Sequence, residues 1–224
     1  MKCDFIKSKS IKDKLYYNKT QMIEIKIDYP YIPQPYAGYN MPFNMYYRQK
    51  AHQNYRYASN KLFNSAIKQY NSSKSQGFPF HSYELVEVFE PTYCKDNFVS
   101  LYRDIYEFTG GAHGNTVRYG NTWDIKRGRQ LALGDLFNKG WDYKYFMLEF
   151  IEGEAKRRKL MGKADYFDNL RENLKKYFDE KNYYLTDKGI AIFYPLYTIA
   201  PYSNGIQVFI IPYLLFGGNL KYSF

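Results

Sequence analysis

Apolar and polar residues alternate from Met22 to Ile32, and three isoleucines of this stretch fall on one side. A period of two is typical of a half-buried β-strand. The next stretch, PQPYAGYNMP, contains three prolines and a glycine and predicts a loop. From Phe43 to about Tyr70 the chain has no Pro or Gly, and its apolar residues recur at helical spacing. This pattern predicts one long amphipathic helix that ends in the breaker stretch NSSKSQGFPF.

Three segments rich in β-branched and aromatic residues follow, namely SYELVEVFEPTYC, FVSLYRDIYEF and NTVRYGNTWDI. Their short connections favour an antiparallel meander with the helix on one face. After the turn KRGRQ and the stretch LALGDLF, a second helix is predicted from about Trp141 to Arg158, and YFDNLRENLKKYFDE predicts a short one after it. The last part predicts a strand, a turn at residues 187–189, a strand, a loop and a strand. The predicted fold class is α+β: an antiparallel sheet packed on a long helix, with a second helical pair and C-terminal strands.

The composition is that of a folded protein with an excess of positive charge. Of 224 residues, 45% are hydrophobic and 24% are charged, which excludes a disordered chain. The formal net charge of +10 is compatible with nucleic acid, an anionic envelope polymer or an acidic protein as partner. The one dense basic cluster, Lys156–Lys163, is typical of a solvated helix face. Nucleic-acid binding through this cluster is an alternative, although no known nucleic-acid motif is present.

Two cysteines, Cys3 and Cys94, are the only thiols of the chain. Their wide spacing excludes a C-x-x-C redox or zinc motif, and they could pair if the start of the chain lies beside the strand that holds Cys94. The stretch MKCDFIKSKSIKDKLYY lacks the apolar centre of a signal peptide, and no apolar run reaches membrane-spanning length. The expectation is a soluble cytoplasmic chain; a cell-envelope or secreted chain whose leader was removed is the alternative.

The stretch TGGAHGNT, Thr109–Thr116, places three glycines and a histidine between two predicted strands. A phosphate cradle would need a lysine and a following helix, and both are missing. A metal site at His113 would need further ligands, but His52 and His81 lie far away in sequence, so neither metal nor cofactor is predicted. Acid–base hydrolysis by His113 with a carboxylate, Asp104 or Glu107, is an alternative. No catalytic residue is assigned, because no nucleophile elbow and no cysteine beside a base occur.

The motifs YEFTGGAHGNT, LALGDLF and FYPLYTIAPYSNGIQVFIIPY, in this order, resemble a bacterial domain of unknown function. That domain forms the C-terminal part of the extracellular region of the lysozyme-sensing anti-sigma-V factor. The segment from about Lys7 to Lys95 resembles the module that usually precedes it and that also occurs in a peptidoglycan deacetylase. The resemblance implies two closely packed parts, residues 1–95 and residues 96–224. It implies a non-enzymatic receptor, since the deacetylase chemistry resides in a separate domain.

The resemblance implies that the ligand is a lysozyme-like protein or a cell-envelope glycan. Animal-type lysozymes are strongly basic, so a chain of net charge +10 would need a local acidic patch to attract one. Candidates for such a patch are Asp165, Asp168, Glu172, Asp179 and Glu180, which a solvated helix explains equally well. The sequence makes no prediction of the oligomeric state. The residues that match the motifs, and are expected to bind or to shape the loops, are Thr109, Gly110, Gly111, His113, Asn115, Pro201, Tyr202, Ser203 and Gly205.

Overall fold

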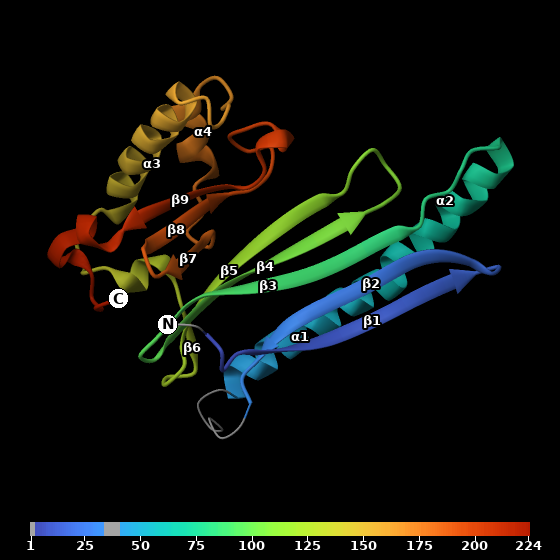
Figure 1. Cartoon of the computed structure of the whole chain (residues 1–224), viewed down its shortest axis with the longest axis horizontal. Coiled ribbons are helices and arrows are strands. Elements are labelled where there is room, and N and C mark those ends of the chain that lie inside the picture. The colour runs from blue at the N-terminus through green and yellow to red at the C-terminus, as the bar shows by residue number, and fades with distance from the viewer. Residues whose placement is uncertain (1–2, 34–40) are drawn as a thin grey trace.

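The computed structural model describes residues 3–33 and 41–224, and it places them in two β-sheets with helices beside each (Figure 1). The large sheet has the strand order β1-β2-β3-β4-β5-β6, and the small sheet has the order β7-β8-β9. The strands are β1 Lys7–Tyr17, β2 Thr20–Tyr31, β3 Tyr83–Lys95, β4 Phe98–Phe108, β5 Asn115–Asp124, β6 Arg129–Leu131, β7 Tyr183–Thr186, β8 Gly189–Tyr194 and β9 Gln207–Pro212. The α-helices are α1 Met41–Tyr57, α2 Phe63–Gln76, α3 Tyr143–Leu160 and α4 Leu170–Tyr177.

The predicted α+β class is confirmed, and one detail of the pairing differs. All neighbouring strands of the large sheet are antiparallel except β2 and β3, which run parallel. The helical segment between them provides the reason, because it carries the chain back along the sheet before β3 starts. The meander of β3, β4 and β5 is antiparallel as predicted. The loop expected after Ile32 lies mostly outside the described residues.

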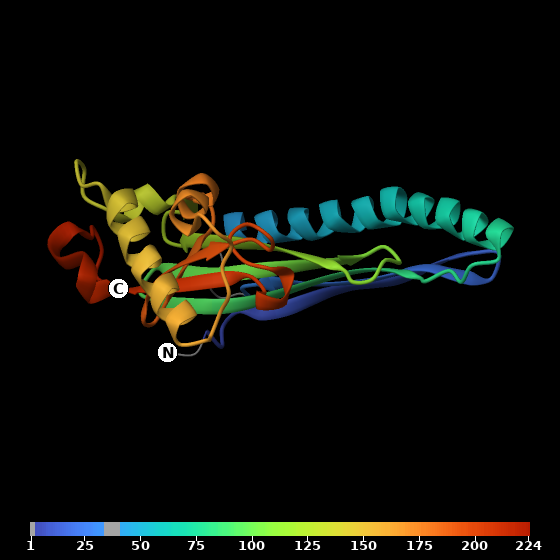
Figure 2. The ribbon, with the colours of Figure 1, turned by 90° about the horizontal axis from the view of Figure 1, so that it is seen from above.

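The predicted long helix is present and extends at both ends. α1 and α2 are joined by the π-helical turn Ala58–Leu62, and Gly77 ends the helix with a positive φ of 73°. The helix lies along one face of the large sheet (Figure 2). The isoleucines of β2 are fully buried there together with Phe43 and Tyr47 of α1. Burying each such side chain stabilises the fold by about 1.5–3 kcal/mol, so this face forms one of the two main cores.

Strand β1 is an element that the periodicity of the sequence did not predict. It contains four lysines, and its side chains alternate between exposed and half-buried positions. Ile11 and Leu15 pack against the core, while the lysines face water. Lysines on an edge strand oppose pairing with another chain. The same lysines hide the strand from a sequence pattern, because they make the segment look uniformly polar.

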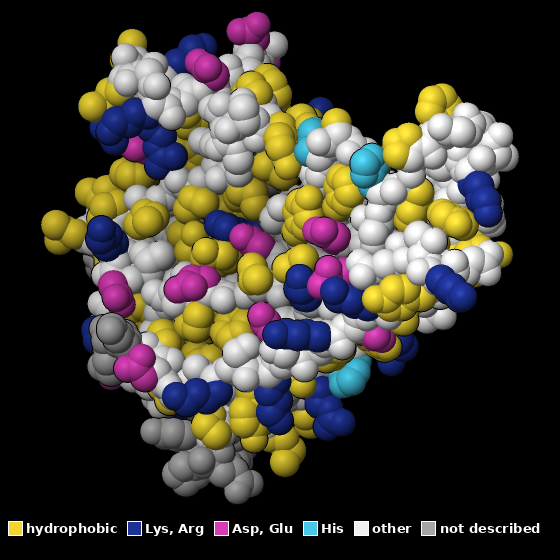
Figure 3. Space-filling model, turned by 45° about the vertical axis from the view of Figure 1, so that its right-hand side comes forward, with side chains coloured by type: hydrophobic (Ala, Val, Ile, Leu, Met, Phe, Trp, Pro, Cys, Tyr) yellow, Lys and Arg dark blue, Asp and Glu magenta, His cyan; other side chains and the backbone are white. Residues whose placement is uncertain are grey.

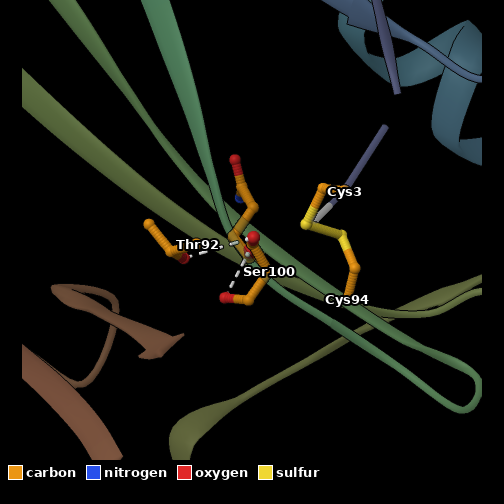
Figure 4. Close-up of a disulfide and its surroundings, with 5 residues drawn as sticks. Cys3, Thr92, Cys94 and Ser100 are labelled. Carbon is orange, nitrogen blue, oxygen red and sulfur yellow. Dashed lines mark hydrogen bonds between the residues drawn. A yellow bond between two sulfur atoms is a disulfide. The ribbon is translucent and has the colours of Figure 1, made fainter. Parts of the chain in front are cut away.

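The two cysteines form a disulfide between the start of the chain and the end of β3 (Figure 4). Their Cα atoms are 5.5 Å apart, and 91 positions separate them in sequence. The pairing that the sequence left open is therefore decided by the fold, which brings residue 3 beside the β3–β4 turn. The predicted boundary between residues 95 and 96 falls in this turn and stays a prediction. None of the helices in the described part of the chain combines the length and apolarity that spanning a bilayer requires.

The second lobe contains the predicted helices and C-terminal strands. α3, α4 and the small sheet surround a separate core that includes Met147, Ile151 and Phe209. Strand β6, which the turn prediction at KRGRQ missed, leads into this lobe from the end of β5. The lobe lies over one end of the large sheet, and the other end of that sheet extends away from it (Figures 1 and 2).

The two sheets touch most closely at Gly120 of β5. A Cβ atom added there would lie 1.9 Å from the carbonyl oxygen of Tyr183 in β7. Next to this contact, the backbone N–H of Leu185 donates to the hydroxyl of Ser100 at 2.8 Å. The Tyr183 hydroxyl donates to the carbonyl of Leu131 at 2.6 Å. The absence of a side chain at Gly120 thus lets the small sheet dock directly on the large one.

We expect Gly120→Ala to lower the free energy of unfolding by at least about 1–3 kcal/mol, because the added methyl group collides with backbone and not with a movable side chain. Chemical denaturation measures the loss. Gly111→Ala is the matched control, since nothing lies within 4 Å of a Cβ at that position. Equal stability of the two variants would contradict the close approach.

Replacing both cysteines by alanine should lower the free energy of unfolding by about 2–4 kcal/mol, because the bridge closes a loop across 91 positions. Urea titrations of the oxidised protein and of the Cys3→Ala/Cys94→Ala variant give the difference. Adding a reductant should destabilise the oxidised protein by a similar amount and leave the double variant unchanged. A reductant effect on the double variant would argue against this explanation.

Candidate functional site

The two motif loops, which come from different sheets, meet at one surface. One loop joins β4 to β5, and the other joins β8 to β9. The rings of His113 and Tyr202 stack with centroids 4.2 Å apart and an interplanar angle of 21°. The Tyr202 hydroxyl donates to the carbonyl of Gly114 at 3.0 Å, across 88 positions of sequence. We call residues 109–115 together with residues 197–205 the paired-loop surface.

A second tyrosine completes the contact. The carbonyl of Gly114 also accepts the Nδ1–H of His113 at 2.9 Å, which leaves Nε2 to accept the Tyr197 hydroxyl at 3.3 Å. The ring of Tyr197 lies 5.4 Å from that of Tyr202. Tyr197 is 53% exposed, whereas Tyr194, at the end of β8, is fully buried.

Backbone geometry explains much of the motif composition. Gly110 has a φ of +81° and lies against the side chain of Gln69 in α2, and Gly205 has a φ of +68°. Glycine adopts such angles without penalty. At Gly114 glycine is needed for another reason: a Cβ atom there would lie 2.3 Å from the ring of Tyr106. Tyr197 has a φ of +62°, an unfavourable value that costs about 1–3 kcal/mol in a residue with a large side chain.

The remaining predicted residues lie around this contact. Pro201 directly precedes the short 3-10 helix Tyr202–Asn204. The side chain of Asn204 donates to the carbonyl of Asp165 at 2.8 Å, which fixes the loop to the segment before α4. The predicted residues that stay exposed to solvent on the paired-loop surface are Thr109, Gly111, His113, Asn115 and Ser203. The structure therefore brings both predicted motifs together, although sequence reasoning did not predict their contact or the role of Tyr197.

Within the described residues, the structure does not pair His113 with a carboxylate, as the hydrolase alternative requires. Both carboxylate oxygens of Asp104 accept hydrogen bonds from Arg118, at 2.8 and 2.7 Å. Burial opposes the charge of Arg118, but the bonds to Asp104 raise its pKa above the usual value. The contacts of His113 are to Gly114, Tyr197 and Tyr202. In residues 3–33 and 41–224, no group of three or more His, Cys, Asp or Glu side chains is arranged to hold a metal ion.

Neighbouring carboxylates pair with Lys156, Arg157 and Arg158 of the basic cluster. Glu154 accepts hydrogen bonds from Arg157 at 2.8 Å and from Arg158 at 2.9 Å, and these bonds hold its pKa below the usual value. Glu152 accepts from Lys156 at 2.6 Å. Figure 3 shows positive and negative side chains intermixed over the face in view. The positive charge of this cluster is therefore partly balanced on the helix itself.

A groove follows β5 on the side that faces α1. It consists of a cavity of about 240 Å³ and a cavity of about 790 Å³, and both are lined by Val117 and Tyr119. We call it the β5 groove. The surface is also indented between the two lobes, at the upper edge of the view in Figure 3. Of the lining residues, sequence reasoning had singled out Asn115, Glu107, Asp179 and Glu180, each for another reason, because no local pattern indicates which strand borders a groove. The other polar and aromatic lining residues are Tyr46, Asn54, Tyr57, Arg118, Asn121, Gln130, Lys181, Asn182 and Tyr183.

Comparisons with known proteins place two family models on the chain. Residues 17–116 match the model described as deacetylase PdaC, and residues 134–214 match a protein family of unknown function, DUF3298. Each model covers less than half of the chain. Their order agrees with the resemblance drawn from the motifs, whereas the link to an anti-sigma factor stays a resemblance. No curated protein matches the chain.

Two solved structures share the fold. One is a member of the DUF3298 family from Bacteroides fragilis NCTC 9343, with a TM-score of 0.71 and 19% identity over 97% of this chain and 93% of that chain. The other is a DUF3298 family protein from Pseudomonas aeruginosa PAO1, with a TM-score of 0.63 and 19% identity over 96% of this chain and 94% of that chain. At this identity the likeness establishes the fold and carries no function over.

A double-mutant cycle tests the contact between the loops. We expect His113→Ala and Tyr202→Ala to be coupled by about 0.5–1.5 kcal/mol in the free energy of unfolding, because each removes the ring on which the other stacks. A cycle between His113→Ala and Tyr145→Ala is the control, since Tyr145 lies exposed on α3. Additive losses in the first cycle would show that the rings do not interact in solution.

Proposed function

We propose that this chain is a non-enzymatic binding module of the cell envelope that recognises a folded protein, of which a lysozyme-like protein is the first candidate. The observation that carries the proposal is the junction of the two motif loops at His113, Tyr202 and Gly114. The junction holds loops from two rigid sheets in one arrangement, and loops supported in this way are frequent sites of recognition. The side chains that stabilise this junction hold the two loops together. The exposed loop residues remain available to contact a partner.

The composition of the paired-loop surface favours a protein ligand. Its exposed positions include Thr109, Gly111, Asn115, Tyr197 and Ser203. Surfaces that have to fit another protein, such as antibody loops, are enriched in the same residue types, because tyrosine supplies contact area and the small polar residues adapt their hydrogen bonds. A wall glycan could stack on the exposed ring of Tyr197 and is the second candidate ligand.

The disulfide supports a location outside the cytoplasm. Structural disulfides persist in oxidising compartments and are rare in the reducing cytoplasm. The bridge between Cys3 and Cys94 therefore favours the envelope or secreted alternative over the cytoplasmic expectation. The deacetylase activity in the name of one matching model is not proposed for this chain, because the resemblance assigns that chemistry to a separate domain.

The charge of the ligand affects binding through the net charge of the chain and through contacts with individual carboxylates. The net charge of +10 would slow encounter with a basic lysozyme at low salt. Asp179 lies exposed in the β5 groove close to the second lobe, while Glu180 is already paired with Lys144. We therefore expect recognition to depend on shape and aromatic contact, with a weak dependence on salt.

A titration of the purified chain with an animal-type lysozyme, at low and at physiological salt, tests the proposal. We expect saturable binding that survives physiological salt and that Tyr197→Ala weakens about tenfold, the loss typical of a truncated aromatic anchor. Tyr145→Ala is the matched control, because it removes a tyrosine of similar exposure from α3. Peptidoglycan fragments are titrated in parallel, and binding of these alone would replace the protein ligand by a glycan. No binding of either, or equal losses in the two variants, would overturn the proposal.

A further inference from the structure

Strand β5 is an open edge of the large sheet over most of its length. It pairs with β4 from Asn115 to Asp124, but with β6 only from Thr122 to Asp124. Within the described ranges, no strand pairs with residues 115–121 on the side away from β4. An edge of this kind presents a row of backbone N–H and C=O groups to any extended chain that approaches.

The two edges of the large sheet differ in how they are protected. The opposite edge, β1, contains four lysines that oppose pairing with a second chain. The open part of β5 contains no lysine, and the charge of its Arg118 is matched by Asp104. Val117 is 40% exposed and Tyr119 is 46% exposed on this edge strand. One edge therefore carries the usual safeguard against strand addition, and the other lacks it.

The groove beside the open edge has room for an extended chain. Its two cavities, of about 240 and about 790 Å³, are both lined by Val117 and Tyr119, so the space continues along the strand. The floor is rigid: Tyr119 lies 5.5 Å from the guanidinium of Arg103, which forms a buried ion pair with Glu87. At the end near β6, the side-chain oxygen of Asn121 is buried and has no hydrogen-bond partner among the residues that the structure describes.

The charge of the groove indicates that its ligand carries a positively charged side chain at one end. Glu107 lines the end near the glycine loop and accepts a hydrogen bond from the Tyr57 hydroxyl at 3.1 Å. Among the described residues it forms no ion pair with a Lys, Arg or His side chain. A partly desolvated carboxylate in this state attracts a cation. The groove thus complements a positively charged side chain at one end, although the whole chain is basic.

We propose that the β5 groove binds an extended peptide segment of a partner protein by β-strand addition to residues 115–121. Apolar side chains at alternate positions of the peptide contact Val117 and Tyr119, and a Lys or Arg of the peptide pairs with Glu107. A peptide satisfies an edge strand better than a glycan does, because its backbone repeats donors and acceptors at the spacing of the strand. This site shares only Asn115 with the paired-loop surface, and the variants that test the two proposals lie at different residues, so failure of one proposal leaves the other intact.

The test uses a library of capped seven-residue peptides that alternate apolar with polar residues and carry Lys or Arg at one end. Fluorescence polarisation measures their binding to the full chain. We expect saturable binding by library members, weakened at least tenfold by Val117→Lys, which places on β5 the kind of charge that protects β1. Glu107→Gln should weaken binding severalfold and reduce its dependence on salt. Val88→Lys is the matched control, because Val88 is similarly exposed on β3 but lines neither cavity of the groove.

Two further measurements establish the mode of binding. Hydrogen exchange of the amides in residues 115–121 should slow when a peptide binds. N-methylation of alternate peptide amides should abolish binding in one of the two possible registers and leave the other unaffected. The proposal is overturned if no library member distinguishes wild type from Val117→Lys, if exchange in residues 115–121 does not change, or if both N-methylated series bind alike.

Discussion

The contact between Gly120 and the backbone of Tyr183 is the constraint on which the remaining architecture depends. Two sheets rarely meet backbone to backbone, because side chains normally keep stacked sheets about 10 Å apart. Here a missing Cβ lets β7 lie directly against β5, and the hydroxyl of Ser100 satisfies the N–H of Leu185 beside it. The orientation of the second lobe, and with it the position of the loop between β8 and β9, follows from this docking.

The paired-loop surface is a consequence of that orientation. His113 belongs to a hairpin of the large sheet and Tyr202 to a loop of the small sheet, and neither could reach the other if the sheets were set farther apart. The carbonyl of Gly114 accepts both the imidazole N–H and the tyrosine hydroxyl, so one backbone group links the two lobes. The polar groups of His113 and Tyr202 are thereby engaged in holding this surface, and this supports the binding role proposed above.

The crossover helix determines the character of the other candidate surface. α1 covers the face of the sheet that includes β5, and it contributes Asn54 to the buried pair of Glu87 and Arg103 through a hydrogen bond of 2.6 Å. Removing a partner from a buried pair of this kind is strongly destabilising, so the sheet beneath the groove has little freedom to rearrange. The groove beside β5 remains open, and in the described part of the chain no strand pairs with residues 115–121 on the side away from β4.

The sequence alone determined the local elements of this protein. Periodicity placed β2, the long helix, the meander of β3 to β5 and the C-terminal strands, because burial of one face requires a repeat of two or 3.6 residues. It did not predict β1, whose lysines mask its alternation, or the short strand β6 within a predicted turn. Of the three glycines in the TGGAHGNT loop, only Gly110 has a positive φ, and at Gly114 the ring of Tyr106 leaves no room for a Cβ atom.

Only the tertiary structure decided how these elements meet. The parallel pairing of β2 with β3, the bridge from Cys3 to Cys94 and the stacking of His113 on Tyr202 join residues that are far apart in sequence. Such contacts leave no local period, so no pattern in the chain could reveal them. The exposure of Tyr197 and the open edge of β5 depend on what lies next to them, and a residue's neighbours in space are set by the fold as a whole.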